Sequence, residues 1–186
     1  PNDCVVSYLP LSHIAEQMFS IHLPATYGFP IWFAGSVDQL KETMIAARPT
    51  IFLAVPRVWE KFKAALEGKL GDATGLKAKI VAWARKVGAK AGPSIINEGR
   101  VGGALGIQYQ LAEKLFFSKL RAQLGLDRLK LAISGAAPIG RDVLEFFLSC
   151  GILIHEVYGQ SEDAGPTSFN QPIPGRRRIG TVGVPF

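Results

Sequence analysis

Short apolar runs alternate with helix-type patterns along most of the chain. Five runs are rich in β-branched and aromatic residues and bounded by proline or glycine, which predicts buried strands. They are CVVSYLP, FPIWFAG, PTIFLAVP, LKLAISG and GILIHEVYG. Helical spacing of apolar positions predicts helices over residues 12–27, 36–47 and 140–149. The alternation predicts an α/β fold, in which a mostly parallel sheet carries helices on both faces.

The predicted boundaries follow from local signals. Ser36 and Gln39 form a capping box before the second helix, which should end before Pro49, and Gly151 closes the third helix. Residues 57–125 interrupt the alternation with mostly helical segments around the glycine-rich stretch GRVGGALG. We interpret them as a helical, basic insertion within a single α/β unit over residues 1–186.

Composition narrows the class of protein. A chain of 186 residues with 48% hydrophobic content can bury one sizeable core. Cys4 and Cys150 lie far apart without a metal-ligand spacing, so we expect neither a disulfide framework nor a zinc site, and a reducing, cytoplasmic setting. No apolar run reaches the roughly 20 residues that span a bilayer. Because Pro1 leads almost directly into a strand-like run, GTVGVPF ends without a closing element and the first residue is not Met, we expect a piece of a longer protein.

The net charge of +6 is concentrated in one segment. Residues 57–100 hold ten Lys/Arg against four Asp/Glu, so this segment carries all of the net charge. Within it, Leu76, Ile80, Trp83 and Val87 recur at helical spacing with basic residues between them. Such a helix suits weak peripheral contact with anionic lipid or phosphate ligands, while a solvated helix pair is the alternative. We expect no nucleic-acid partner.

Four loops are candidates for a ligand site. Ligands of open parallel sheets bind beyond the carboxyl ends of the strands. That rule selects LPLSH at 9–13, VPRVW at 55–59, SGAAP at 134–138 and YGQSE at 158–162. We therefore expect these loops to surround one cleft.

Two familiar chemistries are excluded. GDATGLK and GGALG fail to match the phosphate-loop and dinucleotide motifs. Ser161 follows a predicted strand as a hydrolase nucleophile would, but Asp163 stands where that motif requires Gly. Pro166 would obstruct the following helix, and no histidine follows to complete the triad.

A nucleotide site suits the residues at 158–162 better. The ring of Tyr158 offers a flat face to a base, Ser161 a hydroxyl to a phosphate oxygen, and Glu162 a hard oxygen ligand for Mg²⁺. The small residues of SGAAP allow backbone groups to approach a planar ligand closely. The alternatives are a core tyrosine beside surface acids and an ordinary strand-to-helix turn.

His13 is the candidate for contact with a carboxylate. It follows Ser12, a plausible N-cap, so the positive end of the helix dipole disfavours its imidazolium form. A neutral imidazole that donates one hydrogen bond to a carboxylate is therefore expected, with a structural histidine as the alternative. His22 and His155 have no evident partner and are interpreted as structural.

Together, five motifs resemble a known family. LPLSHIAEQ, VPRVWEK, SGAAPIG, YGQSEDAGPTS and GRRRIGTVGVPF occur in the order typical of adenylate-forming acyl-CoA synthetases. The helical insertion resembles the long-chain fatty acid branch, including its bubblegum-type members. The resemblance covers essentially the whole chain. It implies part of an acetyl-CoA synthetase-like N-terminal domain, which uses ATP and Mg²⁺ to convert a long-chain fatty acid to acyl-AMP and then transfers the acyl group to coenzyme A.

The resemblance also implies roles for individual residues. Tyr158 corresponds to the aromatic against adenine, with Gly159 in the same motif; Ser161 corresponds to the hydroxyl near the α-phosphate, and Glu162 to the acid that helps hold Mg²⁺. Gly135, Ala136 and Ala137 would border adenine and the acyl carboxylate, and His13 would lie beside that carboxylate. Trp59 resembles the aromatic that lines the acyl tunnel, with a core tryptophan as the alternative. Many members have Thr at the position of Ser161, and the hydroxyl is retained.

The family's phosphate loop, ribose-binding aspartate and catalytic lysine have no counterpart in the sequence. We therefore expect no acyl-CoA synthesis from these 186 residues alone. A different class stays open beside the ligase: a non-catalytic α/β module that binds anionic membrane or phosphate ligands through the basic segment.

Overall fold

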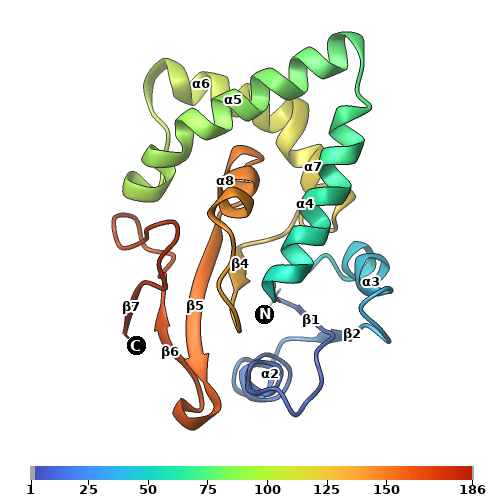
Figure 1. Ribbon diagram of the computed structural model, residues 1–186, viewed down its shortest axis with the longest axis vertical. Helices are drawn as coiled ribbons and strands as arrows, with labels where there is room; N and C mark the ends of the chain where they lie inside the picture. The colour runs from blue at the N-terminus through green and yellow to red at the C-terminus, as the bar shows by residue number, and fades with distance from the viewer. Residues whose placement is uncertain (1–2, 186) are drawn as a thin grey trace.

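The centre of the computed structural model, which describes residues 3–185, is a five-stranded sheet of order β3-β4-β5-β6-β7 (Figure 1). β3 (Ile51–Ala54), β4 (Leu131–Ser134) and β5 (Ile154–Gln160) are parallel. β6 (Gly165–Phe169) and β7 (Val184–Pro185) continue the sheet antiparallel. β1 (Val5–Ser7) and β2 (Ile31–Phe33) form a parallel pair. All five predicted strands are confirmed.

The hairpin of β5 and β6 was not predicted. The stretch GPTSF opens with Gly165 and Pro166, which obscure the alternation that identifies a strand. The two strands are joined by a short 3₁₀ turn over Ser161–Asp163, which ends at Ala164 in the left-handed conformation, with φ of 57°. The hairpin therefore carries the YGQSE motif out beyond the parallel strands.

The first predicted helix is confirmed as three continuous pieces: α1 (Ile14–Gln17), the π-helical turn η1 (Met18–His22) and α2 (Leu23–Tyr27). Pro24 lacks the N–H that an α-helix would donate to residue 20, which fits the change of helical pitch there. The second helix, α3 (Leu40–Ala47), begins four residues later than predicted. Ser36 Oγ does accept the Gln39 N–H at 3.3 Å, but residues 36–39 form a turn. The third, α8 (Arg141–Ser149), is confirmed.

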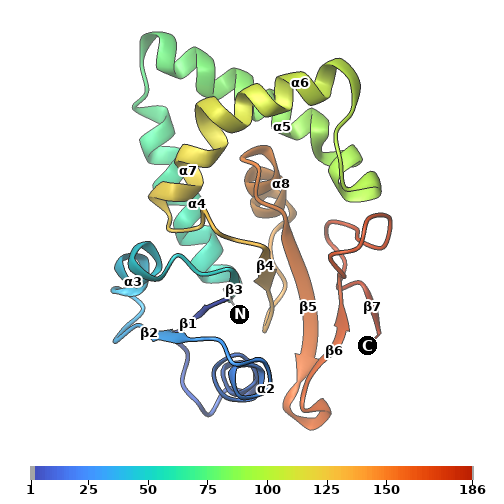
Figure 2. The same ribbon diagram turned by 180° about the vertical axis from the view of Figure 1, so that it is seen from behind.

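Residues 57–125 are helical, as predicted. They form α4 (Pro56–Gly71), α5 (Gly75–Glu98), α6 (Gly103–Ala112), the π-helical turn η2 (Glu113–Phe117) and α7 (Ser118–Gln123). Figures 1 and 2 show α5 and α6 side by side at the end of the molecule away from α2. That this segment is an insertion stays a prediction.

The buried face of α5 differs from the apolar stripe of Leu76, Ile80, Trp83 and Val87 that recurs at helical spacing in the sequence. Leu76 is 73% exposed, and the buried stripe consists of Val81, Ala84, Val87, Gly88, Ala91 and Gly92. A Cβ atom on Gly88 would lie 2.4 Å from the carbonyl oxygen of Ser149 in α8. Small residues on this stripe therefore allow the α5 backbone to approach α8, and this close packing selects the face that is buried.

Alternation along the parallel strands separates two faces of the sheet. Phe52 and Ala132 are buried on the face that packs against α4 and α8, where they meet Trp59 and Phe147. The intervening residues of the strands, such as Ile133, line a cavity beneath the helix formed by α1, η1 and α2. Helices on both faces of the sheet are thus confirmed.

The final motif, GRRRIGTVGVPF, connects to α5. Arg177 Nη2 donates to the carbonyl oxygen of Ile95 at 2.6 Å and its Nε donates to that of Ile96 at 3.1 Å, near the end of α5. Asn170 binds the same motif, because its Nδ2 donates to the carbonyl oxygen of Arg178 at 2.8 Å. Phe186, like residues 1 and 2, lies outside the described residues.

Candidate functional site

The four loops selected from the sequence meet around one cavity. Its volume is about 320 Å³, and each loop supplies lining residues, among them Leu9, Val55, Gly135 and Gly159. The full lining consists of Leu9, His13, Ile14, Ala15, Met18, Phe19, Leu23, Ile51, Leu53, Val55, Leu131, Ile133, Gly135, Ala136, Val157, Gly159, Gly165, Pro166 and Phe169. His13 is the one ionisable side chain in that lining, within the part of the chain that the structure describes. The cavity is therefore an apolar chamber with an imidazole in its wall.

His13 caps the helix that covers this cavity. The sequence predicted Ser12 as the cap, but His13 is the N-cap of α1, and its Nδ1 accepts the Ala15 N–H at 3.2 Å. This correction has a chemical consequence: a ring whose Nδ1 accepts a hydrogen bond carries its proton on Nε2 when neutral. The second nitrogen can then donate to an acyl carboxylate.

Two residues that sequence reasoning missed hold the His13 loop in place. Glu16 is 3% exposed; its Oε2 accepts the Leu9 N–H at 3.1 Å, and its Oε1 accepts a hydrogen bond from Ser20 Oγ. The hydroxyl oxygen of Tyr8 accepts the Val55 N–H at 3.2 Å, and burial raises the pKa of Tyr8 to about 12. For Glu16 the sequence did contain a signal, because an acid three residues after the N-cap is common in the first turn of a helix.

The SGAAP turn brings backbone close to the cavity. A Cβ atom on Gly135 would lie 2.5 Å from Val157 Cγ1, so only glycine fits there without a shift of its neighbour. Ala136 has a φ of 70°, a left-handed conformation that costs an alanine about 1–2 kcal/mol. Both residues line the cavity, whereas Ala137 is exposed and is not part of the lining. Strain of this kind is common where a loop is shaped for a ligand.

The YGQSE motif presents its side chains to solvent. Tyr158 is 49% exposed and forms no ring contact with another aromatic among residues 3–185. Ser161 and Glu162 are exposed on the turn that follows β5. Asp163, in contrast, accepts hydrogen bonds from Gln160 Nε2 at 3.0 Å and from Thr167 Oγ1. The neighbouring acid is thus engaged within the hairpin, and Glu162 is not.

The metal prediction concerns a single protein ligand. Residues 3–185 contain no group of three or more His, Cys, Asp or Glu side chains that would cage an ion. Mg²⁺ commonly takes one or two protein carboxylates and completes its shell with water and substrate phosphates. The donor set at Glu162 fits that pattern, and its role stays a prediction.

Trp59 lies outside this cavity. Its side chain is fully buried, its Nε1 donates to the carbonyl oxygen of Ile133 at 3.2 Å, and its ring packs edge-on against Phe52 and Phe147. The side chain thus packs in the core, and the tunnel role that the resemblance implies stays a prediction. His155 is likewise buried, with Nδ1 2.7 Å from the carbonyl oxygen of Asn170.

Several curated proteins are similar to the chain. It is 41% identical over 174 residues to the long-chain-fatty-acid–CoA ligase ACSBG2 of Gallus gallus, an alignment that covers 91% of this chain and 22% of that protein. The human ACSBG2 is 41% identical over 175 residues, covering 91% and 25%. A putative fatty-acid–CoA ligase, fadD11 of Mycobacterium tuberculosis, is 36% identical over 182 residues, covering 97% and 32%. The chain spans about a quarter of the length of such relatives.

Solved structures share the fold. The adenylation domain of a carboxylate reductase from Mycobacterium chelonae matches with a TM-score of 0.61 at 21% identity, over 89% of this chain and 22% of that one. A malonyl-CoA ligase with methylmalonyl-CoA and AMP bound matches with a TM-score of 0.56 at 19% identity, over 99% and 29%. The family model described as AMP-binding enzyme matches residues 1–186. The resemblance drawn from the five motifs is thereby confirmed, and the chain belongs to the family of AMP-binding enzymes.

Proposed function

We propose that this chain supplies the acyl cavity and one wall of the ATP site of a long-chain fatty acid–CoA ligase. The observation that carries the proposal is the cavity wall, which is apolar except for His13. Apart from His13, the side chains of this wall offer no hydrogen bonds to ribose or phosphate, and the wall gains roughly 25 cal/mol for each Å² of hydrocarbon that it removes from water. The apolar lining therefore favours a fatty acyl chain over the ribose and phosphates of a nucleotide as its occupant.

In this proposal the carboxylate of the fatty acid lies at the His13 end of the cavity. The Nε2–H group of His13 donates a hydrogen bond to one carboxylate oxygen, while the SGAAP turn borders the other side. The free oxygen attacks the α-phosphorus of ATP, the bond to pyrophosphate breaks, and acyl-AMP remains. Orientation of the two reactants accounts for much of the rate, because it converts an encounter into a step between neighbours.

The nucleotide end of the proposal uses the exposed side chains of the β5–β6 hairpin. Tyr158 lies against adenine, the hydroxyl of Ser161 donates to the α-phosphate, and Glu162 holds Mg²⁺. Bound Mg²⁺ would neutralise the charge that builds on the pyrophosphate leaving group. In the second step the thiol sulfur of coenzyme A attacks the acyl carbon, AMP leaves, and the thiol proton passes to solvent or a base.

Titration calorimetry with ATP and Mg²⁺ on the full-length protein tests the nucleotide half. Stacking of a base on an aromatic ring is worth about 1–3 kcal/mol, so Tyr158→Ala should weaken ATP binding by about fivefold or more. Tyr27→Ala is the matched control, since Tyr27 is 63% exposed on α2 and does not line the cavity. Equal ATP affinity in both variants would favour the non-catalytic module.

Acyl-chain preference tests the cavity half. Ala15→Phe adds a ring to the cavity wall, so the full-length protein should lose activity on long-chain acids before it loses activity on short ones. Ala46→Phe on α3 is the control, because Ala46 is exposed and lies outside the cavity lining. An unchanged chain-length profile for Ala15→Phe would show that the acyl chain does not occupy this cavity.

A further inference from the structure

The solvent-facing side of α6 and η2 carries an apolar stripe. Ile107, Leu111 and Leu115 recur every four residues and are 73%, 48% and 39% exposed. The opposite side of the same helix buries Ala112, Phe116 and Phe117 in the core. A helix on the surface of a protein normally places polar residues toward water. An apolar stripe on its outer side therefore indicates a contact with something other than water.

The helices around this stripe carry an excess of positive charge. Residues 75–123 hold nine Lys/Arg, namely Lys77, Lys79, Arg85, Lys86, Lys90, Arg100, Lys114, Lys119 and Arg121. They hold two acids, Glu98 and Glu113, which gives a net charge of +7 where the whole chain carries +6. The excess of positive charge is thus greatest on α5 and the continuous helix of α6, η2 and α7, and it extends beyond the segment identified from sequence.

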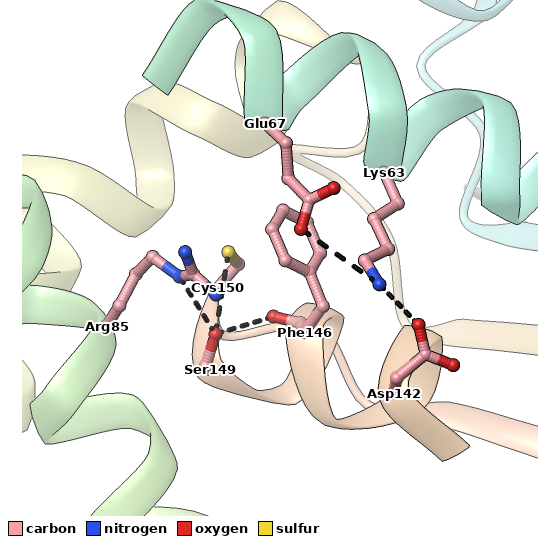
Figure 3. Close-up of polar contacts among 7 residues, drawn as sticks. All are labelled: Lys63, Glu67, Arg85, Asp142, Phe146, Ser149 and Cys150. Carbon is pink, nitrogen blue, oxygen red and sulfur yellow. Dashed lines mark hydrogen bonds and ion pairs between the residues drawn. The ribbon is translucent and has the colours of Figure 1, made fainter. Parts of the chain in front are cut away.

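Basic residues on the inner side of the helical segment are already engaged. Figure 3 shows where α4, α5 and α8 meet: Arg85 Nε donates to Ser149 Oγ at 3.2 Å, and its guanidinium carbon lies 4.7 Å from the centre of the Phe146 ring. Lys63 of α4 pairs there with Asp142. These contacts fix the helices to the core, and these two cations therefore contribute little to the outer surface.

The lysines on the outer side are not engaged in this way. Lys79, Lys86 and Lys90 share the face of α5 opposite its buried stripe, and Lys114 and Lys119 flank the apolar stripe of the neighbouring helix. All five are exposed, and within residues 3–185 none forms an ion pair with a carboxylate. Exposed lysines beside exposed apolar side chains are the composition of a helix that binds an anionic membrane surface.

We propose that α5 and the helix of α6, η2 and α7 form a docking surface for an anionic lipid bilayer. Ile107 and Leu111 enter the interfacial layer, and the outer lysines contact lipid phosphates. The contact is peripheral, because no helix among residues 3–185 is long and apolar enough to span a membrane. Charge complementarity selects lipid over a second copy of this chain, since two such surfaces would bring like charges together.

Vesicle co-sedimentation of the full-length protein tests the proposal, with vesicles of phosphatidylcholine alone or with about a third phosphatidylserine. Binding should require the anionic lipid and weaken as salt rises. Each surface lysine contributes about fivefold to the partition coefficient, so Lys79→Gln, Lys86→Gln and Lys90→Gln combined should lower it by well over tenfold. Ile107→Ser with Leu111→Ser should also reduce binding, at low and at high salt alike.

Matched controls lie elsewhere on the surface. Lys41→Gln with Lys61→Gln removes exposed charges outside the proposed surface, and Ile45→Ser removes an apolar side chain that is 45% exposed on α3. These variants should bind vesicles as the unaltered protein does, and thermal melting checks that every variant folds.

Three results of the vesicle assay would overturn the proposal. They are equal binding to neutral and anionic vesicles, no binding at low salt, and binding that the lysine and apolar variants leave unchanged. If Ile107→Ser with Leu111→Ser instead converts a dimer to a monomer in analytical ultracentrifugation, the surface is an interface between copies and not a lipid contact.

Discussion

Gly159 on β5 and Gly165 on β6 approach so closely that a Cβ atom on Gly159 would lie 2.2 Å from the carbonyl oxygen of Gly165. The contact coincides with a shift in strand register between Tyr158 and Gly159. Sequence resemblance placed Gly159 in a nucleotide-binding motif, and the structure adds a steric reason for glycine. The same close approach fixes the base of the turn that bears Ser161 and Glu162.

Gly159→Ala should therefore destabilise the protein and displace the turn. Forcing a methyl group against backbone costs about 1–3 kcal/mol in a packed region. Urea denaturation measures the loss, and ATP binding measures the displacement. Gly68→Ala on α4 is the control: nothing lies within 4 Å of its Cβ position, so an alanine there should stabilise the helix by roughly 0.5–1 kcal/mol. Equal effects of the two substitutions would contradict the steric explanation.

Glu162→Gln should separate catalysis from stability. The amide keeps the shape of the side chain but removes the charge that the proposed function assigns to Mg²⁺, so ATP–pyrophosphate exchange by the full-length protein should fall by more than about tenfold. Because Glu162 is exposed, the substitution should change the unfolding free energy of the protein by no more than about 0.5 kcal/mol. Glu42→Gln, an exposed acid on α3, should leave both quantities unchanged. If Glu162→Gln keeps its ATP–pyrophosphate exchange activity, Glu162 does not hold Mg²⁺ and is an ordinary surface acid.

Trp59→Phe distinguishes a core tryptophan from a tunnel wall. The substitution removes the Nε1 donor to the Ile133 carbonyl oxygen and leaves space in the packed core, so it should cost about 1–3 kcal/mol of unfolding free energy. The acyl-chain preference of the full-length protein should stay the same, since Trp59 does not line the cavity. A shift in chain-length preference with little loss of stability would support the tunnel interpretation.

Glu156 gives a prediction for the pH dependence of stability. Burial raises the pKa of its carboxyl above the usual 4.5, although the Gly180 and Thr181 amides donate to it and oppose the shift. The folded state therefore binds this proton more tightly than the unfolded state. Stability from this group is fully present below pH 4.5 and is lost as pH rises through the raised pKa.

Glu156→Gln should consequently stabilise the protein at neutral pH. The amide oxygen can still accept the Gly180 N–H, while the buried charge is gone. Urea denaturation across a pH series should give a flatter dependence above pH 4.5 than in the unaltered protein. Glu98→Gln, an exposed acid at the end of α5, serves as the control. A variant that is less stable at pH 7 would show that the charge itself is needed.

Local signals in the sequence determined the regular elements. The β-branched runs, such as the one at Ile51–Ala54, fold as strands because their side chains pack well on a pleated and buried surface. Gly151, in the left-handed conformation with φ of 77°, follows α8 as predicted, because a residue without a Cβ atom adopts that conformation freely. The five motifs and their order also identified the family, because each motif is a short run of neighbouring residues that can be recognised without the fold.

Only the tertiary structure decided which surfaces these elements share. The buried stripe of α5 depends on the fit of Gly88 against the Ser149 carbonyl, a contact between residues far apart in sequence. The role of His13 as N-cap depends on the path of the loop that Glu16 and Tyr8 hold. Likewise, the cavity exists because strand alternation turns one set of residues toward α1 and η1 and the other toward α8. Sequence periodicity defines two faces of each element, but the choice between them is made by the partner that removes one face from water.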